Sequence, residues 1–229
     1  MCQVYFWEVD ESQYSVLFDR LLSIVSVEKR ERVLKLRFPI DQLLTLCAEV
    51  LIRFLVCSQY GIKNDTVIFT TNEYGKPSIQ GYLDFYFNIS HTRSALVVAV
   101  SDSEIGIDIE RVSPADTRIS DRYFSPAEKD FILQSADKNK AFYQIWTKKE
   151  AYIKHIGRGL SIPLTSFNVL DDEIANITQS VERSGYIISV CGMDLQVITL
   201  VDVRRPQFGD RLSDFINGFM PLKYEFHFD

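Results

Sequence analysis

The stretch 105-IGIDIER-111 predicts a buried strand. Three isoleucines alternate there with Gly106, Asp108 and Glu110. Because side chains of a strand point to its two faces in turn, the isoleucines share one face, and Asp108 and Glu110 share the other, about 7 Å apart. Two carboxylates so placed repel each other unless a cation lies between them, so this face is a candidate cation site. Taken alone, an Asp-x-Glu at a strand end is more often a solvated edge.

A second stretch, 146-WTKKEAYIKHIGRGL-160, predicts a helix. It places Glu150 and Lys154 one turn apart on a single face. Alone, this is an ordinary pair that stabilises a helix by about 0.2–0.5 kcal/mol. Together with Asp108 and Glu110, it gives three carboxylates and a lysine, which describe a site for Mg²⁺ and a phosphate ester.

Length and composition indicate a globular chain. Its 229 residues suit a pair of subdomains that share an interface, and 46% hydrophobic residues can bury a large core. The net charge of −6 argues against a general nucleic-acid binder. The basic residues nevertheless gather in two clusters, which are either binding surfaces or solvated helix faces: Lys29, Arg30, Arg32, Lys35 and Arg37, and then Lys148, Lys149, Lys154 and Arg158.

The sequence predicts a cytoplasmic protein with reduced cysteines. Its four cysteines show neither a CxxC motif nor metal-ligand spacing. The first ten residues lack a basic lead, and Glu8 and Asp10 interrupt their apolar run too early for a signal peptide. No run approaches the roughly 20 apolar residues that a membrane span needs.

Periodicity predicts an α+β fold. A basic helix over residues 27–38 is expected to end at Pro39, and an apolar helix over 41–60 at Gly61. A helix opened by Ser125 with a capping box, and a long one over 139–156, follow. The expected strands, mostly antiparallel, are residues 4–9, 67–70, 85–89, 95–100, 105–111, 167–170, 186–190, 195–203 and 224–228. The pattern changes near residue 104, which predicts subdomains 1–104 and 105–229, although no sequence repeat is evident between them.

Four motifs in order identify a family. EYGKP at 73–77, FNISH at 87–91, GIDIE at 106–110 and the 146–160 stretch closely resemble the 4′-phosphopantetheinyl transferases of the surfactin-synthetase-activating (Sfp) type. The resemblance covers nearly the whole chain, including FSPAE at 124–128.

The resemblance implies a fold and an activity. The fold would be a pseudo-twofold pair of similar α+β subdomains with the active site in the cleft between them. The enzyme, of the holo-[acyl-carrier-protein] synthase type, would transfer the 4′-phosphopantetheine arm of coenzyme A to a serine of an apo acyl, peptidyl or polyketide carrier protein. Adenosine 3′,5′-bisphosphate would be released, with Mg²⁺ as cofactor and Mn²⁺ able to substitute. A cytoplasmic monomer serving secondary metabolite biosynthesis, without nucleic-acid or membrane partners, would fit this type.

The resemblance also implies roles for single residues. Asp108, Glu110 and Glu150 would hold the metal, and Glu150 would be the base that deprotonates the carrier serine, directly or through water. Lys154 would neutralise the pyrophosphate as a catalytic and coenzyme-binding residue. The other coenzyme-binding residues would be Lys29, Arg32, Lys76, Ser90 and His91. A structural histidine is the alternative for His91.

Of three further positions, Glu128 and Leu44 remain open to two interpretations. Glu128 matches a carboxylate near the pantetheine cleft, but its place in the capping box explains it equally well. Trp146, one turn before Glu150, is expected to pack in the core. At Leu44 the family often has an arginine that contacts the 3′-phosphate, so this residue either borders the coenzyme without a charge or belongs to the apolar stripe of its helix.

Two other functions compete with the transferase. Three acids and a lysine also suit a Mg²⁺-dependent phosphodiester hydrolase, but the net charge and the lack of an aromatic–basic stripe weigh against nucleic acid. A carrier-binding module without turnover is the third possibility. The intact set Asp108, Glu110, Glu150 and Lys154 argues against it, whereas Leu44 argues mildly for it.

Overall fold

The computed structural model describes residues 2–193, 195 and 198–218. Strands in this part of the chain form three sheets, with the orders β4-β5-β1-β9, β2-β3 and β6-β8-β7. Their bounds are β1 (Cys2–Glu8), β2 (Phe69–Thr71), β3 (Pro77–Ile79), β4 (Tyr86–Thr92), β5 (Ala95–Ser101), β6 (Ile105–Arg111), β7 (Thr178–Arg183), β8 (Tyr186–Gly192) and β9 (Ile198–Asp202).

The helices differ greatly in length, and the two longest, α3 and α6, pack against the sheets. The α-helices are α1 (Tyr14–Ile24), α2 (Val27–Leu34), α3 (Pro39–Tyr60), α4 (Thr117–Tyr123), α5 (Pro126–Gln134), α6 (Lys138–Ile156), α7 (Asp172–Ala175) and α8 (Pro206–Ile216). Short 3₁₀ helices are η1 (Glu11–Gln13), η2 (Asn64–Thr66), η3 (Gly159–Ser161) and η4 (Leu164–Ser166). None of the helices described is both long and apolar enough to cross a membrane.

The two halves of the chain share one topology. In the first half, β1, α3, β4 and β5 follow one another, and β5 lies antiparallel between β4 and β1. In the second half, β6, α6, β7 and β8 repeat this order, and β8 lies antiparallel between β7 and β6. The α+β fold built from two similar halves is therefore confirmed.

The last described elements return to the first half. β9 pairs in parallel with β1, whereas the other strand pairs described are antiparallel, as expected for most strands. On α8, Phe215 packs against Phe54 of α3, with 5.7 Å between ring centroids. The subdomain ranges 1–104 and 105–229 remain a prediction.

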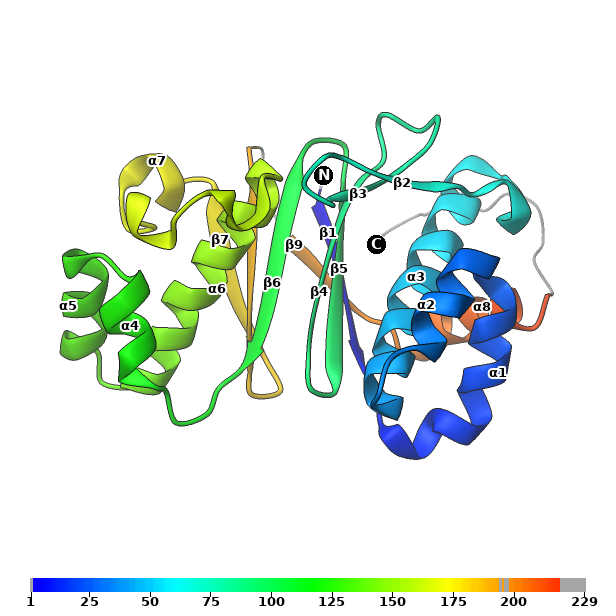
Figure 1. The fold of residues 1–229 in the computed structure, drawn as a ribbon, viewed down its shortest axis with the longest axis horizontal. Coiled ribbons are helices and arrows are strands. Elements are labelled where there is room, and N and C mark those ends of the chain that lie inside the picture. Colours follow the sequence, from blue (N-terminus) through cyan, green and yellow to red (C-terminus); the bar gives the residue numbers. More distant parts are fainter. Residues whose placement is uncertain (1, 194, 196–197, 219–229) are drawn as a thin grey trace.

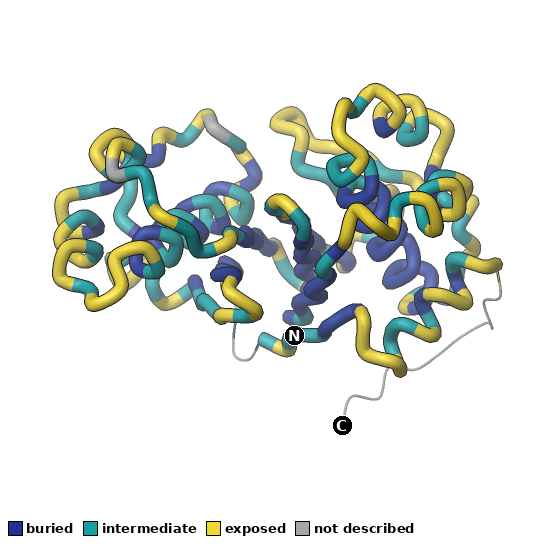
Figure 2. The backbone as a smooth tube through the Cα atoms, turned by 90° about the horizontal axis from the view of Figure 1, so that it is seen from below, coloured by how far each residue is buried: buried dark blue, intermediate teal, exposed yellow. Residues whose placement is uncertain are grey.

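Hydrophobic packing arranges these elements in layers, with helices outside and sheets inside (Figure 1). One cluster joins α3 to one face of the first sheet, and a second cluster joins the other face of that sheet to the isoleucines of β6. Strands β1, β5, β6 and β8 and helix α3 are mostly buried, and Figure 2 shows the buried segments at the centre of the molecule and many of the exposed ones toward its two ends. Leu44 has no exposed surface and lies within the first cluster, so it is a core residue of the apolar stripe. Its side chain therefore offers no surface to a ligand in this structure.

Pro39 was misinterpreted as a helix end. α2 ends at Leu34, and Pro39 instead opens α3 at its first position. Proline suits that position because its fixed φ is helical and its missing N–H would have had no partner there. Gly61 does end α3, in the left-handed region at φ 64°.

The strand expected over residues 167–170 is wrong. The side chain of Asn168 accepts from the Leu170 N–H, and the Phe167 carbonyl accepts from Lys149, so side chains occupy backbone groups that a strand would use. The expected strand 224–228 lies outside the described residues. Elements that the sequence analysis did not predict are α1, α4, α7, α8, β3 and β7.

Candidate active site

The candidate site begins where β4 and β6, edge strands of two different sheets, lie side by side (Figure 1). The Ser90 hydroxyl donates to Asp108 Oδ1 at 2.7 Å, and the Thr92 hydroxyl donates to Glu110 Oε2 at 3.1 Å. In both contacts the residue of β6 comes 18 positions after its partner in β4. Because this offset stays constant along the strands, β4 and β6 run in the same direction. Asn88 supports this alignment, because its Oδ1 accepts from the Ile107 N–H at 3.0 Å.

Helix α6 covers the face of β6 that bears Asp108 and Glu110. Gly106 lies on that face, and a Cβ there would be only 2.0 Å from the Ala151 carbonyl oxygen and 2.3 Å from the His155 nitrogen. Only glycine permits so close an approach of the helix to the strand. The sequence analysis placed Gly106 on this face but did not anticipate its role as the contact point for α6.

Lys154 joins α6 to both strands. Its ammonium lies 2.6 Å from Asp108 Oδ1 and 2.9 Å from the Ser90 hydroxyl oxygen. The sequence analysis considered an ion pair between Lys154 and Glu150, but the lysine pairs with Asp108 of β6 instead. Three predicted site residues, from three elements, are thus in direct contact.

The carboxylates at this point influence one another electrostatically. Burial raises the pKa of Glu150 above its ordinary value, and the negative charge of Asp108 raises it further. Burial likewise raises the pKa of Glu110, with added contributions from the charges of Asp108 and Glu150. A cation among the three carboxylates would relieve this repulsion.

The donor set suits a hard divalent cation such as Mg²⁺. Asp108 is only 5% exposed, and its Oδ2 is buried without a hydrogen-bond partner. A buried oxygen of this kind is a suitable metal ligand. However, the described residues contain no group of three or more His, Cys, Asp or Glu side chains gathered closely enough to hold an ion. The carboxylates would have to turn toward one another to bind one.

The predicted coenzyme-binding residues are more dispersed. Lys29 pairs with Glu49 of α3 at 3.2 Å, and Arg32 is exposed on α2. Lys76 lies in the turn between β2 and β3, where its ammonium is 2.5 Å from Glu104 Oε2. His91 pairs in register with Leu96, a core residue on the α3 side, so it points to the opposite face of β4 from Ser90. Burial lowers the pKa of His91, partly offset by the charge of Asp41 at the start of α3.

Residues next to the site have structural roles. Glu128 is completely buried, forms the expected capping box with Ser125, and pairs with Lys149 at 2.9 Å. Trp146 packs in a hydrophobic cluster, as expected, with its ring stacked on Phe142. The sequence analysis missed the pairing of Lys149 with Glu128. The helical period offered a signal, because Lys149 follows Ile145 and precedes Ile153 on the buried side of α6.

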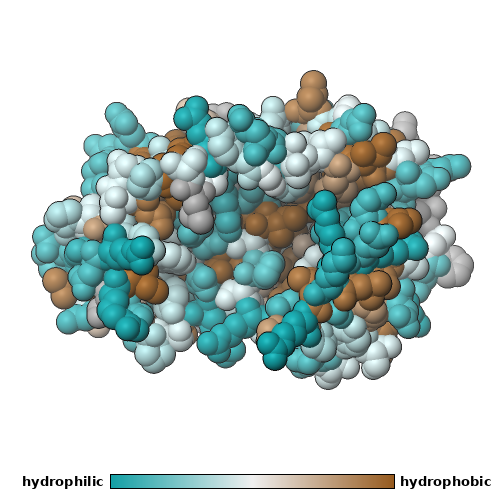
Figure 3. Space-filling model, in the orientation of Figure 1, coloured by the Kyte–Doolittle hydropathy of each residue, from teal (hydrophilic) through white to brown (hydrophobic). Residues whose placement is uncertain are grey.

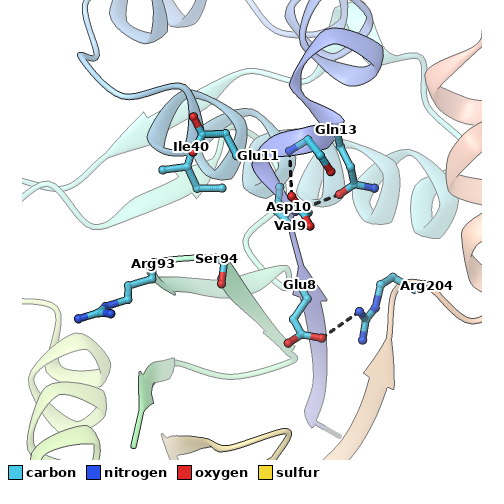
Figure 4. Close-up of a pocket in the computed structure, with 10 residues that line it drawn as sticks. Glu8, Val9, Asp10, Glu11, Gln13, Ile40, Arg93, Ser94 and Arg204 are labelled. Carbon is cyan, nitrogen blue, oxygen red and sulfur yellow. Dashed lines mark hydrogen bonds and ion pairs between the residues drawn. The ribbon is translucent and has the colours of Figure 1, made fainter. Parts of the chain in front are cut away.

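The surface is hollowed between the two halves, as the space-filling view shows (Figure 3). A separate cavity of about 700 Å³ lies beside the end of the β4–β5 hairpin, with Arg93 and Ser94 on one side and Asp10 and Gln13 on the other (Figure 4). An ion pair between Glu8 and Arg204, 2.9 Å long, crosses its lower rim. Neither Asp108 nor Glu150 lines this cavity, so it is distinct from the candidate site.

The two similar halves meet at a polar seam formed by Ser90 and Thr92 of β4 and by Asp108 and Glu110 of β6. This fold and this site define a class of protein, which comparison with known proteins identifies. Residues 104–201 match the model of the 4′-phosphopantetheinyl transferase superfamily, and residues 7–103 match that of the 4′-phosphopantetheinyl transferase N-terminal domain. The chain is 34% identical over 209 residues to the 4′-phosphopantetheinyl transferase psf-1 of Bacillus pumilus, covering 90% of each chain. It is 39% identical over 153 residues to Sfp of Bacillus subtilis, covering 66% of this chain and 68% of Sfp. With gsp of Aneurinibacillus migulanus the identity is 38% over 171 residues, covering 73% and 70% of the two chains.

The chain belongs to the 4′-phosphopantetheinyl transferase superfamily, and its similarity to Sfp and psf-1 makes it a transferase of the Sfp type. It is an enzyme that transfers the phosphopantetheinyl group of coenzyme A to a carrier protein.

Proposed function

We propose that this transferase depends on Mg²⁺ and that Asp108, Glu110 and Glu150 hold the ion. The observation that supports this best is the buried Oδ2 of Asp108, which has no hydrogen-bond partner. The charge of Asp108 also raises the pKa values of Glu110 and Glu150. When bound, the ion would supply Lewis-acid stabilisation of the pyrophosphate oxygens.

The remaining chemistry is assigned to side chains of the chain. The oxygen of the carrier serine attacks the phosphorus that bears the pantetheine arm, and the bond from that phosphorus to the nucleotide phosphate breaks. Adenosine 3′,5′-bisphosphate leaves with the electron pair of that bond. Glu150 takes the serine proton, directly or through water.

Lys154 is proposed to stabilise the charge that develops on the pyrophosphate as this bond breaks. Its ammonium already lies between Asp108 and Ser90, at the seam of the two halves. Lys154→Ala is expected to lower kcat more than the affinity for coenzyme A, because the charge is needed most in the transition state. Lys154→Arg is expected to restore activity only in part, because guanidinium is larger and differently hydrated.

Coenzyme A is proposed to lie across the first half, in contact with Lys29, Arg32, Lys76, Ser90 and His91. Lysine and arginine suit its phosphates, Lys76 is beside the seam, and Ser90 already contacts Lys154. Lys29 would exchange its pairing with Glu49 for a phosphate.

The setting of the reaction is also a proposal. We infer a cytoplasmic monomer, since four buried free cysteines suit a reducing compartment and the chain already holds two similar halves. The substrate would be an apo acyl, peptidyl or polyketide carrier of secondary metabolism, and the net charge of −6 speaks against a nucleic-acid partner.

The decisive experiment follows the mass of an apo carrier protein incubated with the enzyme and coenzyme A. The carrier should gain one phosphopantetheine arm with Mg²⁺ or Mn²⁺, and adenosine 3′,5′-bisphosphate should appear in equal amount. Excess chelator should stop the reaction, and added Mg²⁺ should restore it. Full activity in excess chelator would show that the carboxylates do not act through a metal.

A further inference from the structure

The end of α6 depends on residues from the other half of the chain. The last turn of this helix carries Lys154 and stops at Gly157, whose φ of 73° is left-handed. The last four carbonyls of an α-helix have no partner within the helix, and unsupported ends fray. The Gly157 N–H satisfies the carbonyl of Ile153, so the carbonyls that follow need partners from elsewhere.

Two side chains of the turn between β2 and β3 supply such partners. The Lys76 ammonium donates to the His155 carbonyl at 3.1 Å, and the Asn72 side-chain amide donates to the Gly157 carbonyl at 2.9 Å. A positive charge is also favourable at this end of a helix, where the macrodipole is negative. The turn approaches so closely that a Cβ on Gly157 would lie 2.9 Å from Lys76 Cδ.

Asn72 both shapes this turn and attaches it to α6. Its Oδ1 accepts from the N–H groups of Tyr74 and Lys76, each at 2.9 Å. Its amide nitrogen points the other way, to Gly157. One exposed side chain therefore fixes the backbone that presents Lys76 and holds the end of the helix that presents Lys154.

We infer that Asn72 is a positioning residue of the transferase. Together with Lys76, it caps the last turn of α6 and so keeps Lys154 against Asp108 and Ser90. Lys154 lies two residues before the helix ends, within the turn that would fray first. This inference rests on the role proposed for Lys154. It adds that the turn of the first half sets the geometry of a residue of the second.

The variant Asn72→Asp separates the two functions of this side chain. Aspartate keeps an oxygen for the N–H groups of Tyr74 and Lys76, but it replaces the amide donor with a second acceptor opposite the Gly157 carbonyl. Its charge also opposes the negative end of the helix. We expect kcat to fall about tenfold, with less than a threefold change in KM for coenzyme A, as befits loss of one hydrogen bond.

Thr70→Val is the matched control in the same hairpin. It removes the contact between the Thr70 and Ser78 hydroxyls, 2.8 Å apart, which does not reach α6. Its kcat should stay within about twofold of the parent. Hydrogen exchange of the amides at 154–157 should quicken in Asn72→Asp and not in Thr70→Val.

A double variant tests whether Asn72 acts through Lys154. In a Lys154→Ala background, Asn72→Asp should lower kcat by less than about a further twofold, because the side chain that Asn72 positions is gone. Losses that simply multiply would overturn the inference, as would an unchanged kcat in Asn72→Asp. If Lys154→Ala alone keeps full turnover, the proposed role of Lys154 fails instead, and the inference fails with it.

Discussion

Lys149 and Glu128 form an ion pair 2.9 Å long in which both side chains are completely buried. Lys149 also donates to the carbonyls of Leu164 and Phe167, and Glu128 accepts from the Val169 N–H. The pair therefore joins α6, α5, η4 and the segment that follows η4. Lys149 immediately precedes Glu150 on α6, so the pair fixes this helix one residue away from the candidate site.

Breaking this pair should destabilise the protein strongly. Lys149→Met leaves a buried carboxylate without its cation, which typically costs about 3–5 kcal/mol. Urea unfolding of the variant should show this loss in the free energy of unfolding. Lys138→Met, an exposed change on the same helix, should alter it by less than about 0.5 kcal/mol. Equal stability of the two variants would contradict a structural role for the pair.

Asp108→Asn should lower kcat by at least about 100-fold. The substitution keeps the size of the side chain but removes the charge that pairs with Lys154 and that is proposed to hold the metal. Turnover is measured from the mass of the carrier protein, in saturating coenzyme A. Asp130→Asn, on the exposed side of α5, is the control and should keep its activity. Normal turnover of Asp108→Asn would exclude this carboxylate from the reaction.

Leu44→Arg should unfold the protein rather than improve coenzyme binding. Leu44 is fully buried among apolar side chains, and an unpaired charge there costs several kcal/mol. The melting temperature should collapse, whereas Gln59→Arg on the exposed side of α3 should melt like the parent. A stable Leu44→Arg with tighter binding of coenzyme A than of dephospho-coenzyme A would contradict the buried position.

Acid should weaken the junction between the two halves at Asp202. Burial raises the pKa of this carboxyl, but hydrogen bonds from Arg204 and Arg183 outweigh that effect and lower the pKa to about 2. A carboxyl with a depressed pKa in the folded state stabilises the fold above its unfolded pKa, near 3.9, and this contribution is lost as the pH falls through about 2.

Melting curves of the parent and Asp202→Asn between pH 2 and 6 test this contribution. The parent should melt higher above about pH 4, and the two curves should converge near pH 2. A difference that persists unchanged at pH 2 would mean that packing, and not the charge of Asp202, joins β9 to Arg183 of β7.

The sequence analysis predicted the strand and the helix that carry the candidate site better than it predicted the fold around them. Alternation in 105–111 and the helical spacing of Glu150 and Lys154 are local, and the structure has both elements where they were expected. The shared topology of the halves was not visible, because it lies in the order of elements and not in similar residues. β7 in particular carries mixed residues of intermediate burial, so it shows no clear alternation.

Contacts between distant segments were the main features that the sequence analysis did not predict. Lys149, Lys76 and Asn72 each donate to backbone carbonyls of distant segments, and every residue possesses a carbonyl, so no motif reveals these contacts. Pro39 shows another limit, because a proline suits the first position of a helix as well as the position after one.

Gly106→Ala tests whether the close contact between β6 and α6 sets the candidate site. The added methyl would overlap backbone atoms at Ala151 and His155, which cannot move aside as a flexible side chain can. The helix must therefore shift away from the strand, carrying Lys154 away from Asp108. We expect a lower melting temperature together with a fall in kcat of more than about tenfold, since small displacements of reacting groups are costly.

Gly185→Ala is a control for strain without displacement of α6. Gly185 lies at the β7–β8 turn with a left-handed φ of 79°, and a Cβ there would meet nothing within 4 Å. It should lose stability but keep kcat below its melting temperature. If Gly106→Ala instead keeps full turnover, the position of α6 on β6 does not limit the reaction.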